Sequence, residues 1–167
     1  LKEVGIDTRG LKRDEHVHTT LAFVHTLADG DREFSFYRNP GADMMLSEED
    51  IDEDLIASSK IFHFGSLSMT DETCRRATRR AINIAEKSGA LLSFDPNLRE
   101  PLWRTLSDAK REILYGMEHC HILKISDNEI QWLTGLEDFD EGIDMLQQRF
   151  HIPLILLSLG KEGSRAY

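Results

Sequence analysis

Four short apolar runs recur at nearly regular intervals through the second part of the chain. They are Ile61 to Phe64, Leu91 to Phe94, Ile122 to Ile125 and Leu154 to Leu157, and consecutive runs begin about 30 residues apart, which is the length of one strand followed by one helix. The runs are apolar at almost every position instead of alternating, a pattern typical of parallel strands covered on both faces. We therefore expect an α/β fold with a layered, mostly parallel sheet flanked by helices.

Helical patterns fill the intervals between these runs. The predicted helices are 71–88, 107–117, 126–134 and 140–150, and an earlier helix is predicted from an N-cap at Ser47 to about Ser58. No linker or low-complexity stretch divides residues 1–167, so we expect a single domain with βα units over about residues 60–167. The chain lacks an initiator Met, begins within a helical segment at Leu1 and ends on Tyr167 where a strand should continue, so we expect an incomplete domain.

A small β-ribbon is predicted before the sheet, over about residues 17–40. Its strands are expected at 19–28 and from Phe34 onward, joined by a turn at residues 29–31 and broken after Arg38 by an Asn-Pro-Gly sequence. Successive side chains of a strand point to opposite faces, so Phe36 and Arg38 share one face and Tyr37 lies on the other. An aromatic ring beside a guanidinium suits a polar ring-shaped ligand, whereas a lone arginine on a strand is ordinarily a solvated charge.

Composition and charge exclude several classes of partner. The formal net charge of -10 would repel a phosphate backbone, so nucleic acid is not expected. The arginines at 75, 76, 79 and 80 are spaced as the solvated face of a helix whose other face carries Cys74 and three alanines. No run approaches the ~18 apolar residues of a membrane span, and the N-terminus lacks a signal-peptide pattern. Cys74 and Cys120 have no disulfide or zinc spacing, which favours reduced thiols and a cytoplasmic protein.

Polar side chains follow each of the four predicted parallel strands. The segments are Gly65-Ser66, Asp95 to Arg99, Lys124 to Glu129 and Ser158 to Gly163. Ligands of open α/β sheets bind outside the carboxyl ends of the strands, so these four segments are expected to line one groove.

Several candidate residues in the groove also have an explanation without a ligand. Arg99 could be solvated beside a capped Asp-Pro turn. Ser126 and Glu129 have the spacing of a capping box at a helix start. The two glycines after Ser158 suit a plain β-hairpin. Among the histidines, His63 is predicted to be packed in the core, and His119 and His121 have no distant partner at zinc-site spacing.

Taken together, the segments resemble the ribokinase-like (PfkB-type) carbohydrate kinases, and in particular their fructokinase-like branch. The resemblance rests on Val4 to Thr8, on FYRNPGADM from Phe36 to Met44, on DPNLR from Asp95 to Arg99, and on the segments from Lys124 and Ser158. It spans essentially the whole chain, and FYRNPGADM and DPNLR are its most specific parts. The β-ribbon would then form part of the lid over the sugar, and two ribbons that cover each other would give a homodimer.

The resemblance implies an ATP-dependent sugar kinase that transfers the γ-phosphoryl group to a primary sugar hydroxyl with Mg²⁺ on the phosphates. In this family the sugar would meet Phe36, Tyr37, Arg38 and Arg99, with Arg99 also stabilising the transferred phosphoryl group. The nucleotide side would comprise Asn97, Lys124, Ser126, Gly160 and Gly163. Glu129 would act on the metal through water. Phe36 stands where relatives that bind keto-acid sugars have tyrosine, which favours fructose as the substrate.

Two family motifs are absent from residues 1–167. The glycine-rich sugar site would precede Leu1, and the GAGD segment with the catalytic base would follow Tyr167, so no aspartate here is assigned as the base and the chain alone is expected to be inactive. A non-catalytic α/β domain that binds a sugar or nucleotide remains the alternative. A dinucleotide-binding enzyme is disfavoured, because no GxGxxG follows a predicted strand.

Overall fold

The computed structural model describes residues 1–28, 30 and 32–167 and contains two sheets. The larger has five strands in the order β3 (Ile61–Gly65), β4 (Leu91–Asp95), β5 (Ile122–Ser126), β6 (Leu154–Ser158) and β7 (Ser164–Ala166). Its first four strands are parallel and β7 is antiparallel to β6. The predicted α/β sheet and its four parallel strands are therefore confirmed.

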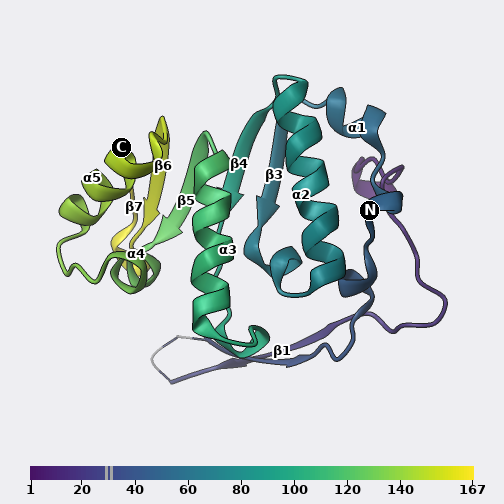
Figure 1. The fold of residues 1–167 in the computed structure, drawn as a ribbon. Coiled ribbons are helices and arrows are strands. Elements are labelled where there is room, and N and C mark those ends of the chain that lie inside the picture. The colour runs from purple at the N-terminus through teal and green to yellow at the C-terminus, as the bar shows by residue number, and fades with distance from the viewer. Residues whose placement is uncertain (29, 31) are drawn as a thin grey trace.

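The second sheet is the predicted ribbon, an antiparallel pair of β1 (Leu21–Thr26) and β2 (Arg32–Tyr37). Figure 1 shows this pair lying across the end of the large sheet toward which the parallel strands run. Of the predicted turn at Asp29, Gly30 and Asp31, the two aspartates lie outside the described residues. Gly30 has φ +89°, a conformation that glycine adopts readily.

The helices match the predicted ones closely, with one exception. They are α1 (Glu53–Ala57), α2 (Glu72–Lys87), α3 (Leu106–His119), α4 (Asp127–Thr134) and α5 (Phe139–Phe150). Short 3-10 turns lie at Lys2–Val4, Ala42–Met45, Glu48–Asp50, Ser66–Met69, Glu100–Leu102 and Gly160–Glu162. None of the helices in the described part of the chain has the length and apolar character needed to cross a bilayer.

The exception is the helix predicted from Ser47 to Ser58, which is wrong as one element. Ser47 forms a capping box with Asp50, but the turn it starts ends there. The side chain of Asp52 then accepts the Leu55 N–H and starts α1 afresh. Ser47 and Asp52 therefore each cap the start of a separate element. The extended backbone at Ile51 separates the 3-10 turn from α1.

The core lies between the sheet and the helices on one face (Figure 1). Phe94 and Leu92 of β4 are completely buried, and Gly116 of α3 lies so close to Phe94 that a Cβ there would be 2.5 Å from the ring. Successive parallel strands are neighbours, so right-handed crossovers place their connecting helices on the same side. Within the described residues these helices cover one face of the sheet.

The other face of the sheet is open in the described part of the chain. Ile61, Leu91 and Leu156 on this face are 54%, 48% and 38% exposed. His63 also lies here and is exposed, with its ring Nδ1 3.1 Å from the Ser93 hydroxyl. The prediction of a core histidine is wrong, because alternation along β3 directs His63 away from the helix-covered face.

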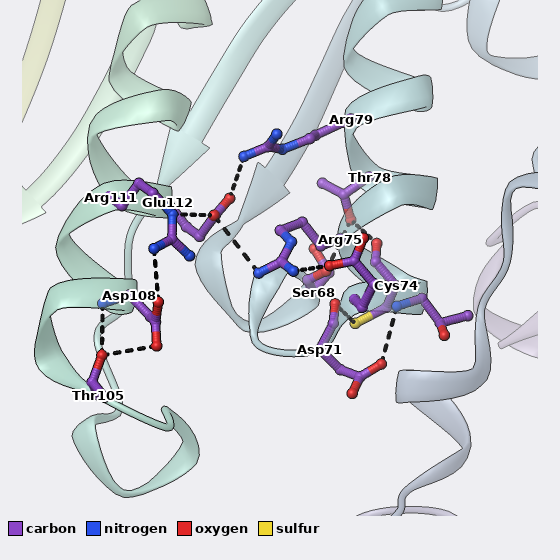
Figure 2. Close-up of polar contacts among 12 residues, drawn as sticks. Ser68, Asp71, Cys74, Arg75, Thr78, Arg79, Thr105, Asp108, Arg111 and Glu112 are labelled. Atoms are coloured by element: carbon purple, nitrogen blue, oxygen red, sulfur yellow. Dashed lines mark hydrogen bonds and ion pairs between the residues drawn. The ribbon is translucent and has the colours of Figure 1, made fainter.

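An ion-pair network joins α2 to α3 (Figure 2). The carboxylate of Glu112, 1% exposed, lies 3.7, 2.7 and 3.1 Å from the guanidinium nitrogens of Arg75, Arg79 and Arg111. The prediction that the α2 arginines form a solvated face is therefore wrong for Arg75 and Arg79, whose partner is supplied by another helix. Arg76 remains 60% exposed at its side chain.

Candidate functional site

The carboxyl ends of the parallel strands lie side by side, as the sequence predicts. Gly65 at the end of β3 pairs with Asp95 at the end of β4, and Ser126 at the end of β5 pairs with Ser158 at the end of β6. The polar segments after β4 and β5 line a cavity of about 350 Å³. Five predicted residues meet in its wall, namely Asn97, Arg99, Lys124, Ser126 and Glu129. We call it the strand-end cavity.

Glu129 anchors two walls of the strand-end cavity to each other. Its Oε1 accepts the Leu98 N–H at 2.7 Å, and its Oε2 accepts the N–H and the O–H of Ser126 at 2.9 and 2.7 Å. The predicted capping box at the start of α4 is confirmed. The hydrogen bond from Leu98 is not part of the capping box. It connects α4 to the loop after β4. Glu129 is only 9% exposed.

The loop after β4 is fixed from both sides. The Ser66 hydroxyl donates to the carbonyl of Pro96, and Asn97 has φ 44°, a left-handed conformation that asparagine tolerates better than most residues. Lys124 lies 3.3 Å from Asp95 Oδ2, while Asp95 Oδ1 is buried without a hydrogen-bond partner among the described residues. Sequence reasoning assigned no role to Ser66 or Asp95; the position of Asp95 at a strand end was the available signal.

Arg99 is half-buried and held by an aromatic ring. Its guanidinium lies over the Phe34 ring of β2 at 4.7 Å from the centroid, and Nη1 donates to the Leu98 carbonyl at 3.0 Å. A fully solvated Arg99 is therefore excluded. From the sequence Phe34 was placed only at the start of the second ribbon strand, because nothing there shows that a strand residue and a residue 65 positions later meet.

Arg38 is held by a set of hydrogen bonds that we call the Arg38 clamp. Nε donates to Asp43 at 2.7 Å, Nη1 to the Thr70 hydroxyl at 2.8 Å and Nη2 to the Leu67 carbonyl at 3.0 Å. Nη2 also lies 2.7 Å from Asp43, and the Arg38 side chain is 5% exposed. The reading of a solvated charge is therefore wrong, and the clamp ties the ribbon to the turn after β3.

The predicted faces of β2 are confirmed. Phe36 and Arg38 line the same cavity of about 660 Å³, which lies between the ribbon and the turn after β3; we call it the ribbon cavity. Tyr37 points the other way, is 57% exposed, and stacks on His18 with ring centroids 4.5 Å apart.

The glycines after β6 form a β-hairpin turn. β7 returns antiparallel to β6, and Leu159 N–H donates to the Gly163 carbonyl at 2.8 Å. Gly160 and Gly163 have φ +54° and +99°, which explains why glycine occupies both positions. Neither lines the strand-end cavity, so their contact with a nucleotide stays a prediction.

The described residues show neither a reactive cysteine nor a cluster of metal ligands. Cys74 and Cys120 are free and buried, and burial raises the pKa of the Cys120 thiol to about 12, which keeps it protonated at neutral pH. The part of the chain that the structure describes contains no group of three or more His, Cys, Asp or Glu side chains arranged to hold a metal ion.

Comparison with known proteins agrees with this geometry. The model of the pfkB family of carbohydrate kinases matches residues 1–167. The chain is 42% identical to a probable fructokinase-2 of Arabidopsis thaliana and 43% identical to fructokinase-2 of Solanum lycopersicum, covering 100% of this chain and 51% of each relative. It therefore spans about half the length of these relatives.

Solved structures of fructokinases are also similar to this chain. A fructokinase from Vibrio cholerae O395 with fructose, ADP and calcium ion bound superposes with a TM-score of 0.88 at 28% identity, over 100% of this chain and 53% of that one. A fructokinase from Xylella fastidiosa with bound ATP gives 0.85 at 32% identity, over 99% and 51%. Since the family model matches the chain from end to end, the chain belongs to the pfkB family of carbohydrate kinases.

Proposed function

We propose that the intact protein, of which this chain would be about half, transfers the γ-phosphoryl group of ATP to a primary hydroxyl of fructose. The observation that carries the proposal is the strand-end cavity, where Arg99 and Lys124 bring two cations together with polar strand ends. Relatives named as fructokinases, and a solved one that holds fructose and ADP, support fructose and the nucleotide as substrates.

Arg99 and Lys124 would act by position and charge. Phosphoryl transfer depends mostly on alignment of the reactants and on neutralisation of charge on the phosphoryl oxygens. The Arg99 guanidinium presents several N–H donors and has no carboxylate partner in the described part of the chain. Lys124 sits 3.3 Å from Asp95 and would share its charge between that carboxylate and a phosphate.

The cationic site residues would suit nucleotide phosphates, whereas the site would contact Mg²⁺ only through the metal's bound water. Mg²⁺ keeps several waters and binds mainly through phosphate oxygens and one or two carboxylates, supplying charge neutralisation when bound. The Glu129 oxygens already accept three hydrogen bonds from the protein. Glu129 would therefore hold metal-bound water at most, while its main effect is to fix the loop that carries Asn97 and Arg99. For Gly160 and Gly163 we propose backbone contact with the nucleotide, by family resemblance alone.

The sugar would lie in the ribbon cavity beside Phe36 and Arg38. Most N–H groups of Arg38 are already used in the clamp, so one remaining N–H on Nη1 would reach a sugar hydroxyl. Tyr37 lies on the opposite face of β2 and would affect the sugar only through the ribbon. The general base and anion hole would come from protein outside residues 1–167.

A homodimer through the ribbon and a cytoplasmic location complete the proposal. Register pairs Leu21 with Tyr37 and Phe23 with Ser35, so these side chains share the outward face of the ribbon. Leu21, Phe23 and Tyr37 are 49%, 62% and 57% exposed, and two such faces together would cover them. The two free, buried thiols support a reducing compartment.

A coupled assay of ADP release by the intact protein, run over a panel of hexoses, pentoses and keto-acid sugars with ATP and Mg²⁺, tests the activity. We expect saturable turnover that depends on fructose. Sugar or nucleotide binding without turnover on any sugar would favour the non-catalytic alternative and overturn the kinase proposal.

A further inference from the structure

The inward face of β2 carries three consecutive groups of the candidate site. Phe34 and Phe36 stack with ring centroids 6.1 Å apart and an angle of 10° between the rings, and Arg38 follows two residues later in the same direction. Phe36 and Arg38 line the ribbon cavity, whereas Phe34 lies beneath the guanidinium of Arg99 at the strand-end cavity. One strand face therefore lines the ribbon cavity and also contacts Arg99 in the wall of the strand-end cavity.

The contact between Phe34 and Arg99 differs from the other arginine contacts of the site. Arg38 is paired with Asp43, but Arg99 has no carboxylate partner within the described ranges. Its known contacts are the Phe34 ring and its own neighbour's carbonyl at Leu98. A ring face attracts a guanidinium without neutralising it. The charge thus stays available to an incoming anion while its location is fixed.

We propose that Phe34 is a positioning residue for phosphoryl transfer, which holds the Arg99 guanidinium at the strand-end cavity and links its placement to the ribbon strand that contacts the sugar. The inference rests on the proposed kinase function and adds a residue to it. Phe36 and Arg38 contact the sugar from the same strand face as Phe34, so sugar binding stabilises the strand position at which Phe34 holds Arg99 beside the phosphoryl group. Phe34 itself touches neither reactant.

The alternative is that Phe34 only covers apolar surface of the ribbon. Leucine would replace it well in that role, because it is apolar and of suitable size. As a positioning residue Phe34 requires the aromatic face, so Trp would replace it and Leu would not. Its contribution would also vanish when Arg99 is absent, since residues that act through one contact are not additive.

The experiment measures kcat, KM for fructose and KM for ATP in the intact protein carrying Phe34→Leu, Phe34→Trp, Arg99→Ala and the double variant Phe34→Leu with Arg99→Ala. We expect Phe34→Leu to lower kcat about 3- to 10-fold, which corresponds to about 0.7 to 1.4 kcal/mol and lies within the range of a cation–π contact. KM for fructose and the melting temperature should change little. Phe34→Trp should retain kcat within about 2-fold, and the double variant should be no slower than Arg99→Ala.

The chain offers a matched control in α5, where Arg149 lies over the Phe150 ring at 4.8 Å. Phe150→Leu removes the same kind of contact away from both cavities, so it should leave kcat unchanged. Equal losses with Leu and Trp at position 34, or a further loss in the double variant, would overturn the inference while wild-type turnover still supports the kinase. Absence of turnover in the wild type would instead overturn the proposed function.

Discussion

The Arg38 clamp and the strand-end cavity hold their arginines in opposite ways. Arg38 is 5% exposed, with a carboxylate, a hydroxyl and a carbonyl as acceptors. Arg99 is half-buried and has an aromatic ring and one carbonyl. A guanidinium paired with a carboxylate fixes the ribbon in place, whereas one that is held without neutralisation keeps its charge for a ligand. Two arginines that the sequence placed in one substrate-binding set thus have different structural roles.

Arg99→Ala should have the largest effect, because it removes the unpaired cation from the strand-end cavity. We expect kcat to fall about 10²-fold or more, the usual loss for a positioned transition-state donor, with KM for fructose nearly unchanged. Steady-state kinetics of ADP release by the intact protein measure both values. A rise in KM for fructose at constant kcat would show that Arg99 acts on the sugar alone.

Arg38→Ala should affect folding as well as sugar binding, because Asp43 and two further acceptors lose their partner. We expect about 2–3 kcal/mol of lost stability, typical of a buried charged hydrogen-bond partner, together with a roughly 10-fold higher KM for fructose. Denaturant unfolding and kinetics on the same sample measure the two effects. An unchanged free energy of unfolding would show that the clamp contributes little to stability. The proposed difference in role between Arg38 and Arg99 would then be wrong.

Glu129→Gln should have a smaller effect. It distinguishes a role of Glu129 in anchoring the loop after β4 from a role in binding metal. Gln retains one acceptor oxygen but places an NH₂ where the carboxylate accepted protein N–H or O–H groups. We expect about 1–2 kcal/mol of lost stability and a reduced kcat, with the Mg²⁺ concentration for half-maximal activity little changed. A large shift in that Mg²⁺ concentration would instead make Glu129 a metal residue.

Tyr37→Phe should have the smallest effect. The ring stack on His18 survives loss of the hydroxyl, and the side chain faces away from both cavities. We expect less than about a 2-fold change in kcat or KM, within the effect of an exposed polar group. A larger change in KM for fructose than that of Arg38→Ala would show that the sugar contacts the Tyr37 face of β2 instead of the face of Phe36 and Arg38.

The sequence predicted those features that depend on neighbouring residues. The four parallel strands follow from their apolar runs, and the box between Ser126 and Glu129 is readable because capping acts over three residues. The meeting of the segments after β4 and β5 was also predictable, since parallel strands share one carboxyl edge. The predicted groove of four segments is met only in part, because the segments after β3 and β6 do not line the strand-end cavity.

Contacts between distant segments could not be predicted in this way. Glu112 meets Arg79 across 33 residues and Arg38 meets Thr70 across 32. The α2 arginines were therefore read as a solvated face, and Arg38 was predicted as a sugar-binding residue without the clamp that holds it. His63 was misplaced because an apolar run does not show which face of a strand the rest of the structure covers. The contact of Phe34 could not be predicted either, because its partner Arg99 lies in the loop after β4.

The most direct test of the account is a structure of the intact protein with fructose and a non-hydrolysable ATP analogue. We expect the terminal phosphate to lie in the strand-end cavity, within hydrogen-bond distance, about 2.7–3.2 Å, of the Arg99 guanidinium, while that guanidinium remains over Phe34. Fructose should lie in the ribbon cavity beside Phe36 and Arg38. A terminal phosphate bound away from Arg99 and Lys124 would contradict the account.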